Sequence, residues 1–159
     1  MAILSIDPGL TTGWASGSAH AENPHERGLT GSHPFAENRS CDYGDLGDRF
    51  GKWLAALMRA RQCTRLVIER QFGAEDANSS YLQGLAFVAH IVAYQLKVPR
   101  HEIPPASWKL LAVGKGNASK KEVQAAMEKS GWRASDEHGY DAAAILVAYR
   151  IKLNRIASK

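Results

Sequence analysis

The residues of this chain best suited to chemistry are carboxylates that end short apolar segments. Residues 2–6 form a mostly apolar run that ends in Asp7 and is followed at once by a Pro-Gly pair. Residues 65–68 repeat this pattern and end in Glu69. An aspartate before Pro-Gly often only caps a turn, but two bare carboxylates at neighbouring strand ends repel strongly unless a cation bridges them. The repetition therefore favours a cation-binding site over a turn cap.

A third carboxylate, Asp141, lies near the start of the last helical pattern. His138 is three positions and Glu137 four positions before it, and such spacings put side chains on one helix face. With the two strand-end carboxylates, Asp141 and either His138 or Glu137 would supply ligands that Mg²⁺ or Mn²⁺ binds. Acidic residues at a helix start are also favourable electrostatically, and for Asp136 and Glu137 we prefer that interpretation.

The elements that must position these residues follow from hydrophobic periodicity and turn residues. Strands are predicted at residues 2–7, 13–18, 28–35, 65–69 and 100–103, and helices at 43–61, 78–97, 119–129 and 135–156. The first three strands should form an antiparallel meander. The first and fourth should be parallel neighbours about 4.8 Å apart, which places Asp7 beside Glu69. We expect one α/β domain spanning residues 1–159, with a five-stranded mixed sheet flanked by helices.

Helix-start signals refine these predictions. Ser119 and Glu122 form a capping-box pattern, and Ser135 is the expected N-cap of the last helix. The helix at 78–97 is apolar nearly all round, so it needs a second surface to bury. After the last strand we expect a proline stop and then a flexible basic loop at 114–117.

The distribution of charge indicates a polyanionic partner. The formal net charge is +4, and residues 97–133 carry eight Lys or Arg against three Glu. The tail after Asp141 is basic and contains no acidic residue. A basic second half beside acidic site residues favours a polyanion, and a solvated basic surface is the alternative.

No secretory segment and no membrane span is expected, because the apolar runs are too short. Cys41 and Cys63 fit neither a metal-binding spacing nor a disulfide framework, so we interpret them as reduced thiols. These features predict a cytoplasmic protein that has no membrane partner.

Four motifs occur in one order: Ile6-Asp7-Pro8-Gly9 with Thr12-Gly13; Ile68-Glu69-Arg70-Gln71-Phe72; Lys109 with residues 114–120; and His138-Gly139-Tyr140-Asp141-Ala142. Together, over nearly the whole chain, they resemble the RuvC-type Holliday junction resolvases of the RNase H-like superfamily. The resemblance implies an RNase H-like fold and a metal-dependent endonuclease, usually a homodimer, that nicks two opposed strands of a four-way DNA junction symmetrically. It implies phosphodiester hydrolysis with two Mg²⁺ or Mn²⁺ ions per active site. A bacterial member would be nucleoid-associated, and a phage member would act in the host cytoplasm.

Residue by residue, the resemblance makes Asp7, Glu69 and Asp141 the metal-binding carboxylates. His138 stands where the family often has an aspartate, which leaves the choice between Mg²⁺ and Mn²⁺ open. We expect its imidazole to contribute to the second metal site or to handle the proton of the attacking water.

The resemblance also assigns residues to DNA. Lys109 and Lys120 fall where the family has basic residues important for cleavage, and without the resemblance they would be read as surface lysines. Lys115 and Lys121 of the same basic segment are expected to hold backbone phosphates. Phe72 falls on the aromatic that stacks at the opened junction, and a core aromatic at a strand end is the alternative.

Other functions fit parts of the pattern. Asp7-Pro8-Gly9-Leu10-Thr11-Thr12 is similar to the phosphate loop of actin-like ATPases and sugar kinases, but those proteins need two such domains around a cleft. A non-cleaving junction-binding protein or an RNA-directed nuclease would use the same fold. Intact carboxylates argue against the inert version, because keeping them clustered without a metal is costly.

Overall fold

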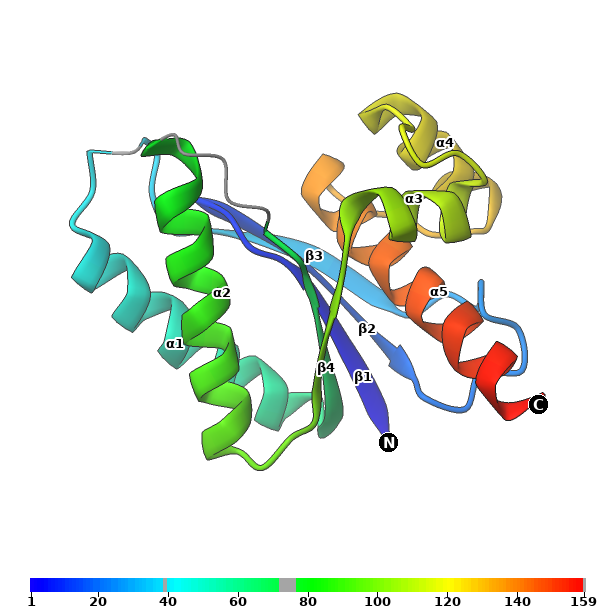
Figure 1. Cartoon of the computed structure of the whole chain (residues 1–159), viewed down its shortest axis with the longest axis horizontal. Helices are drawn as coiled ribbons and strands as arrows, with labels where there is room; N and C mark the ends of the chain where they lie inside the picture. The colour runs from blue at the N-terminus through cyan, green and yellow to red at the C-terminus, as the bar shows by residue number, and fades with distance from the viewer. Residues whose placement is uncertain (39, 72–76, 159) are drawn as a thin grey trace.

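A mixed β-sheet forms the centre of the molecule (Figure 1). The computed structural model describes residues 1–38, 40–71 and 77–158, and within these ranges the sheet has five strands in the order β3-β2-β1-β4-β5. The strands are β1 (Ala2–Asp7), β2 (Thr11–Ser18), β3 (Leu29–Pro34), β4 (Cys63–Glu69) and β5 (Arg100–Ile103). Pairing is antiparallel between β1, β2 and β3, and parallel between β1, β4 and β5. The predicted meander and the predicted parallel neighbours are both confirmed.

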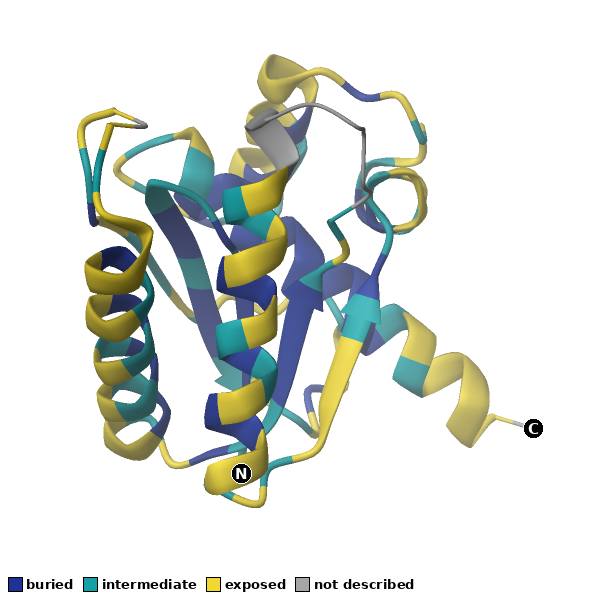
Figure 2. Cartoon of the chain, turned by 60° about the vertical axis from the view of Figure 1, so that its left-hand side comes forward, coloured by how far each residue is buried: buried dark blue, intermediate teal, exposed yellow. Residues whose placement is uncertain are grey.

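Helices cover both faces of the sheet. On one face lie α1 (Tyr43–Ala60) and α2 (Ala77–Gln95); on the other lies α5 (Glu137–Ala157), on which α3 (Pro105–Val113) and α4 (Lys120–Lys129) pack (Figure 1). The outer sides of α1 and α2 are exposed, whereas the strands behind them are buried (Figure 2). None of the helices in the described ranges combines the length and the apolar character that crossing a membrane requires.

The core has two layers because successive residues of a strand point to opposite faces of the sheet. Ile3 of β1 and Val67 of β4 belong to the buried cluster under α5. Leu4 and Leu66 belong to the cluster under α1 and α2. The short apolar runs of the sequence are thus strands buried on both faces.

The register between β1 and β4 determines where the last side chain of each strand lies. Ile6 is the partner of Ile68 in the parallel pair, so the next residues, Asp7 and Glu69, emerge together at the same end of the sheet. Both lie on the face that α5 covers, because side chains alternate along each strand.

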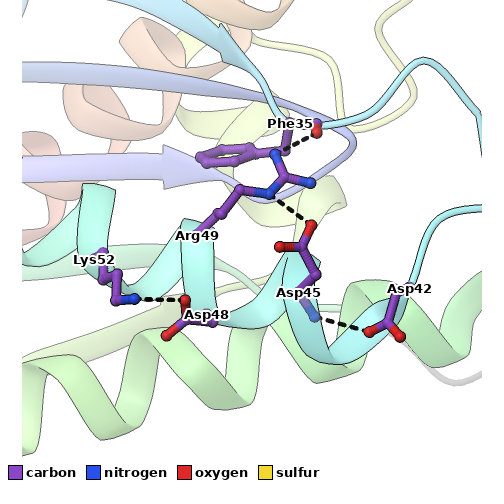
Figure 3. A network of polar contacts seen from close by, with 6 residues as sticks. All are labelled: Phe35, Asp42, Asp45, Asp48, Arg49 and Lys52. Carbon is purple, nitrogen blue, oxygen red and sulfur yellow. Dashed lines mark hydrogen bonds and ion pairs between the residues drawn. The ribbon is translucent and has the colours of Figure 1, made fainter.

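Tertiary contacts hold α1 despite the three glycines in its sequence. Gly51 lies so close to α2 that a Cβ there would be 3.1 Å from a valine methyl group. At the helix start, the Asp42 carboxylate accepts a hydrogen bond from the backbone N–H of Asp45 at 2.9 Å (Figure 3). Arg49 donates to the Asp45 carboxylate and to the carbonyl of Phe35, both at 2.7 Å, and so ties α1 to the segment after β3.

The sequence interpretation missed α3. Pro105, read as a strand stop, is the first residue of this helix, a position where the missing N–H of proline has no intrahelical partner to lose. Gly114 ends α3 with a left-handed φ of 89°, which glycine adopts without steric cost. The predicted basic loop at 114–117 follows this helix and contains no helical residue.

The predicted N-cap of α5 is also wrong. Asp136, not Ser135, caps the helix: its carboxylate accepts a hydrogen bond from the backbone N–H of Gly139 at 3.0 Å. Ser32 of β3 donates a second hydrogen bond to the same carboxylate. The structural role preferred for Asp136 is confirmed, and this residue fastens the start of α5 to the edge of the sheet.

Candidate active site

Three carboxylates meet where β1 and β4 end against α5. Asp7 ends β1, Glu69 ends β4, and Asp141 is buried near the start of α5. Burial raises the pKa of Asp7 well above its ordinary value, and the negative charges of Glu69 and Asp141 raise it further. Burial also raises the pKa of Glu69, and the charge of Asp141 acts in the same direction. The structure therefore brings together the three carboxylates that the sequence predicted to converge.

The start of α5 approaches the sheet so closely that it leaves no room for a side chain. A Cβ at Gly13 of β2 would lie 1.9 Å from the carbonyl oxygen of His138, so only glycine permits this contact. The Thr30 hydroxyl donates to a carbonyl of the first turn of α5 at 2.8 Å, and the Ser5 hydroxyl donates to the carbonyl of Ala142 at 2.7 Å. These contacts fix the backbone around the buried carboxylate of α5.

Lys120, the first residue of α4, forms an ion pair with Asp141. The capping box of Ser119 and Glu122 starts α4 at this point, as predicted. Partial burial lowers the pKa of Lys120, but its hydrogen bond to Asp141 and the charges of Asp141 and Asp7 outweigh that effect and raise it. Lys120 is therefore a protonated cation placed among the carboxylates.

Trp108 of α3 holds Glu69 and was not singled out from the sequence. Its indole Nε1–H donates to Glu69 Oε2 at 2.7 Å, and this bond lowers the pKa of Glu69 against the larger effect of burial. A tryptophan side chain has one donor and no acceptor, so it can pair with a carboxylate such as Glu69. The sequence does not show this pairing, because it depends on where α3 packs. The ammonium group of Lys109 lies 5.4 Å from the centroid of the Trp108 ring.

The remaining predicted DNA-binding residues lie around the same end of the molecule or outside the described ranges. Lys115 forms an ion pair with Glu122 at 2.7 Å. Lys121 follows Lys120 in the first turn of α4 and is exposed. Phe72 is outside the described residues.

His138 lines a cleft of about 370 Å³ together with Asp7 and Lys120. Glu137, which the sequence interpretation assigned to helix electrostatics, is exposed. Its negative charge nevertheless reaches the site, because it raises the pKa of both Asp7 and Lys120. His138 and Glu137, the two candidates for a fourth cation-binding residue, therefore both act on the site of the carboxylates.

The donor set fits a hard divalent cation by its chemistry. Carboxylate oxygens are the ligands that Mg²⁺ and Mn²⁺ prefer. Burial is the main cause of the raised pKa values of Asp7 and Glu69, and the charge of Asp141 adds to both. In the part of the chain that the structure describes, no three His, Cys, Asp or Glu side chains are already gathered as a metal cage. Lys120 instead provides the positive charge at Asp141. Metal binding by Asp7, Glu69, His138 and Asp141 thus stays a prediction.

We expect Asp7→Asn to raise the Tm of the cation-free protein near neutral pH. A carboxyl group whose pKa is raised by folding stabilises the fold below its unfolded pKa of about 4, and this contribution is lost as pH rises through the folded pKa. At neutral pH the ionised Asp7 therefore costs stability, and removing its charge should raise Tm by a few degrees, at about 2–4 °C per kcal/mol for a domain of this size. The difference should shrink as pH is lowered.

Asp48→Asn is the matched control, since Asp48 is exposed and pairs with Lys52 at 2.7 Å. That change should leave Tm unchanged or slightly lower at every pH. Thermal unfolding in EDTA near pH 5 and pH 7.5 makes the comparison, and added Mg²⁺ or Mn²⁺ should stabilise the wild type more than Asp7→Asn. A lower Tm for Asp7→Asn at the higher pH would contradict the crowding of charge.

The chain is similar in sequence to crossover junction endodeoxyribonucleases RuvC. The protein of that name from Chlamydia trachomatis serovar L2 is 30% identical over 132 residues, which cover 80% of this chain and 75% of the relative. The protein from Chlamydia caviae is also 30% identical over 132 residues, covering 80% of this chain and 76% of the relative. No model of a protein family matches the chain.

Solved structures with the same architecture are known. Thermus thermophilus RuvC superposes with a TM-score of 0.75 at 17% identity, covering 98% of this chain and 96% of that one. A structure of T. thermophilus RuvC in complex with Holliday junction substrate gives 0.78 at 18% identity with the same coverage. The yeast mitochondrial Holliday junction resolvase Ydc2 gives 0.66 at 11% identity, covering 98% of this chain and 80% of that one. These likenesses confirm the predicted RNase H-like fold.

Proposed function

Because the chain belongs to the RuvC family of crossover junction endodeoxyribonucleases, we propose that it resolves four-way DNA junctions by nicking two opposed strands symmetrically. The observation that carries this proposal is the meeting of Asp7, Glu69 and Asp141 at one end of the sheet, with Lys120 among them. Support also comes from a structural neighbour that was solved with a Holliday junction substrate.

The proposed cofactors are two Mg²⁺ or Mn²⁺ ions per active site, held by Asp7, Glu69 and Asp141 with His138. When bound, such ions activate a water molecule and stabilise the oxygens of the phosphodiester that carry developing charge. The indole of Trp108 occupies one oxygen of Glu69 and so fixes the orientation in which the carboxylate presents its other oxygen.

Lys120 has a separate role in this mechanism. Its ammonium group forms an ion pair with Asp141 in this structure. If it exchanged that contact for the scissile phosphate, it would place a fixed positive charge where negative charge develops. Lys109, Lys115 and Lys121 would hold backbone phosphates on either side, and Phe72 would stack at the opened junction. Binding through these lysines should weaken as salt rises.

The test is cleavage of a labelled synthetic four-way junction beside a matched duplex and an RNA of the same sequence. Reactions contain Mg²⁺, Mn²⁺ or EDTA, and the nicks are mapped on all four strands. We expect paired nicks at symmetric positions in two opposed junction strands, only with a divalent cation. Junction binding without nicks would instead identify a non-cleaving junction-binding protein, and preferential cutting of the RNA would identify an RNA-directed nuclease.

We expect a homodimer joined largely through α2. Phe87, Ile91 and Tyr94 are 66%, 41% and 75% exposed on its outer side, while the opposite side of α2 packs in the core. Such an exposed apolar stripe is typical of an interface. Phe87→Glu should weaken dimerisation at least about 30-fold, the cost of losing a central apolar anchor. Sedimentation at micromolar concentration measures the change.

Leu110→Glu is the matched control for the dimer. Like Phe87, Leu110 is a large apolar side chain that is exposed, in its case 58% exposed on α3. That change should leave the dimer intact. A wild-type monomer that still makes paired nicks would contradict the proposed dimer decisively.

His138→Ala should remove most of the cleavage activity, and Glu137→Gln should matter little. His138→Asp should retain activity and shift the preferred ion from Mn²⁺ toward Mg²⁺, because a nitrogen ligand is softer than a carboxylate. Initial rates over a concentration series of each ion measure the effect. Should His138→Ala cut at the wild-type rate with both ions while Glu137→Gln fails, Glu137 is the fourth group and the assignment of His138 is wrong.

A further inference from the structure

A second charged site lies at the end of the sheet opposite the carboxylates. Arg27, Arg61 and Arg133 line one pocket of about 790 Å³, formed by the start of β1, the facing parts of β2 and β3, the turn after α1 and the α4–α5 connection. None of the described residues that line it is acidic. We propose that this pocket binds a phosphate group, supplied either by a nucleic-acid backbone or by a free phosphate compound.

The three arginines line the same pocket, in which no described lining residue is acidic. Within the described ranges, no ion pair involves any of the three. The guanidinium of Arg61 lies over the ring of Trp14, 5.2 Å from its centroid, and its buried Nε has no hydrogen-bond partner among the described residues. Like charges that line one pocket repel one another, and an anionic ligand would offset this repulsion.

Arg133 is fixed in place by backbone carbonyls. Its Nη1 donates to the carbonyls of Glu128 and Trp132 at 3.0 and 2.7 Å. The nearby Glu128 carboxylate accepts hydrogen bonds from Gln124 and Tyr140, both at 2.9 Å. It forms no ion pair with Arg133, but the charge of Arg133 adds to these bonds in lowering its pKa, so the charge of this arginine is partly offset. A guanidinium held along one edge is pre-organised for a ligand, since less side-chain entropy is lost on binding.

A fourth arginine stands directly behind the pocket wall. The buried guanidinium of Arg150 donates to the carbonyls of Ser18 and Glu26 at 3.0 and 2.6 Å, which holds the connection that carries Arg27. A Cβ at Gly17, a lining residue, would lie 2.3 Å from Arg150 Nη2. This Nη2 is buried without a described partner. Burial lowers the pKa of Arg150 and the charge of Glu26 raises it, so this guanidinium is partly compensated and its role is to hold the wall of the pocket in place.

The chemistry of these groups favours phosphate. A guanidinium matches the geometry of phosphate oxygens with two parallel hydrogen bonds, and a phosphate carries enough negative charge to compensate more than one arginine. The pocket is also distinct from the proposed cleavage site. Ala2, which lines the pocket, and Asp7 are the first and last residues of β1. The five steps between them span about 17 Å at 3.3 Å per residue.

Titration calorimetry with sodium pyrophosphate, against sodium chloride of equal ionic strength, tests the site on the whole chain. Arg61→Gln and Arg27→Gln should each weaken pyrophosphate binding at least about tenfold, the loss expected for a charge-assisted contact, and Arg61→Lys should weaken it less. Arg59→Gln is the matched control, because Arg59 is an exposed arginine of the last turn of α1 outside the pocket lining. It should change binding less than about twofold, since its contribution is only long-range.

A second measurement distinguishes the two sources of phosphate. Binding of a 20-base-pair duplex in EDTA is followed over a salt series. A salt slope that falls by about one for Arg61→Gln, but not for Arg59→Gln, assigns the phosphate to a nucleic-acid backbone. An unchanged slope with lost pyrophosphate binding assigns it to a free phosphate compound.

The proposal is overturned when the wild type binds no pyrophosphate beyond the chloride control and the salt slopes are equal. It is equally overturned when Arg59→Gln loses as much as Arg61→Gln. Circular dichroism confirms folding of each variant, and Arg27→Gln carries the test if Arg61→Gln fails to fold.

Discussion

Asp7→Asn, Glu69→Gln and Asp141→Asn are each expected to slow junction cleavage at least about 10²–10³-fold, while junction affinity changes less than about threefold. The rate should fall because each change removes a charge that holds the cations of the proposed mechanism, and loss of one electrostatic group in an active site costs about 10²–10³-fold. Affinity should persist because phosphate contacts made by basic residues dominate DNA binding. Each substitution is nearly isosteric, so the fold should survive.

Single-turnover cleavage and equilibrium binding of the same labelled junction separate these two effects. Asp48→Asn, which removes an exposed carboxylate of α1 (Figure 3), is the control for charge and should cut at the wild-type rate. Asp141→Asn also weakens the contact with Lys120. Full activity in any one of the three variants would remove that carboxylate from the site.

Lys120→Ala should slow cleavage about 10²-fold and change junction affinity little. A cation at the scissile phosphate is most effective as negative charge develops, so its loss appears in the rate and not in ground-state binding. The same change deletes the positive charge that pairs with Asp141. We therefore also expect the divalent-ion concentration for half-maximal rate to fall, since the ion no longer competes with an ammonium group for that carboxylate.

Lys152→Ala provides the contrast, since Lys152 is exposed on α5, in its C-terminal part. It should weaken junction binding slightly, lower the salt slope by about one and leave the rate of the bound complex unchanged. Equal effects of the two changes on rate and affinity would make Lys120 one more phosphate contact.

The sheet and the three carboxylates could be predicted because both depend on local patterns. Short apolar runs with alternating faces predicted the parallel pairing that puts Asp7 beside Glu69, and helical spacing placed Asp141 near the start of the last helix. Family resemblance supplied the roles of these residues, which stay predictions.

The features that were missed depend on tertiary contacts. Pro105 fits a strand stop and a helix start equally well in sequence, and burial of Trp108 in the cluster under α5 decides for the helix. Ser135 and Asp136 are both good N-caps, and the hydrogen bond from Ser32 of β3 selects the second. The hydrogen bond from Trp108 to Glu69 and the effect of the Glu137 charge on Asp7 connect segments far apart in sequence. No local sequence pattern therefore predicts them.

The ion pair of Lys120 with Asp141 has a consequence for the newly synthesised protein. These two residues are separated by 21 positions, so the pair becomes available as soon as α4 and α5 come together. The third carboxylate then has a counter-charge encoded in the chain itself, and the fold need not wait for an ion from its surroundings. Under the proposed mechanism, maturation would be the replacement of this internal cation by an external one, a step that follows folding and does not limit it.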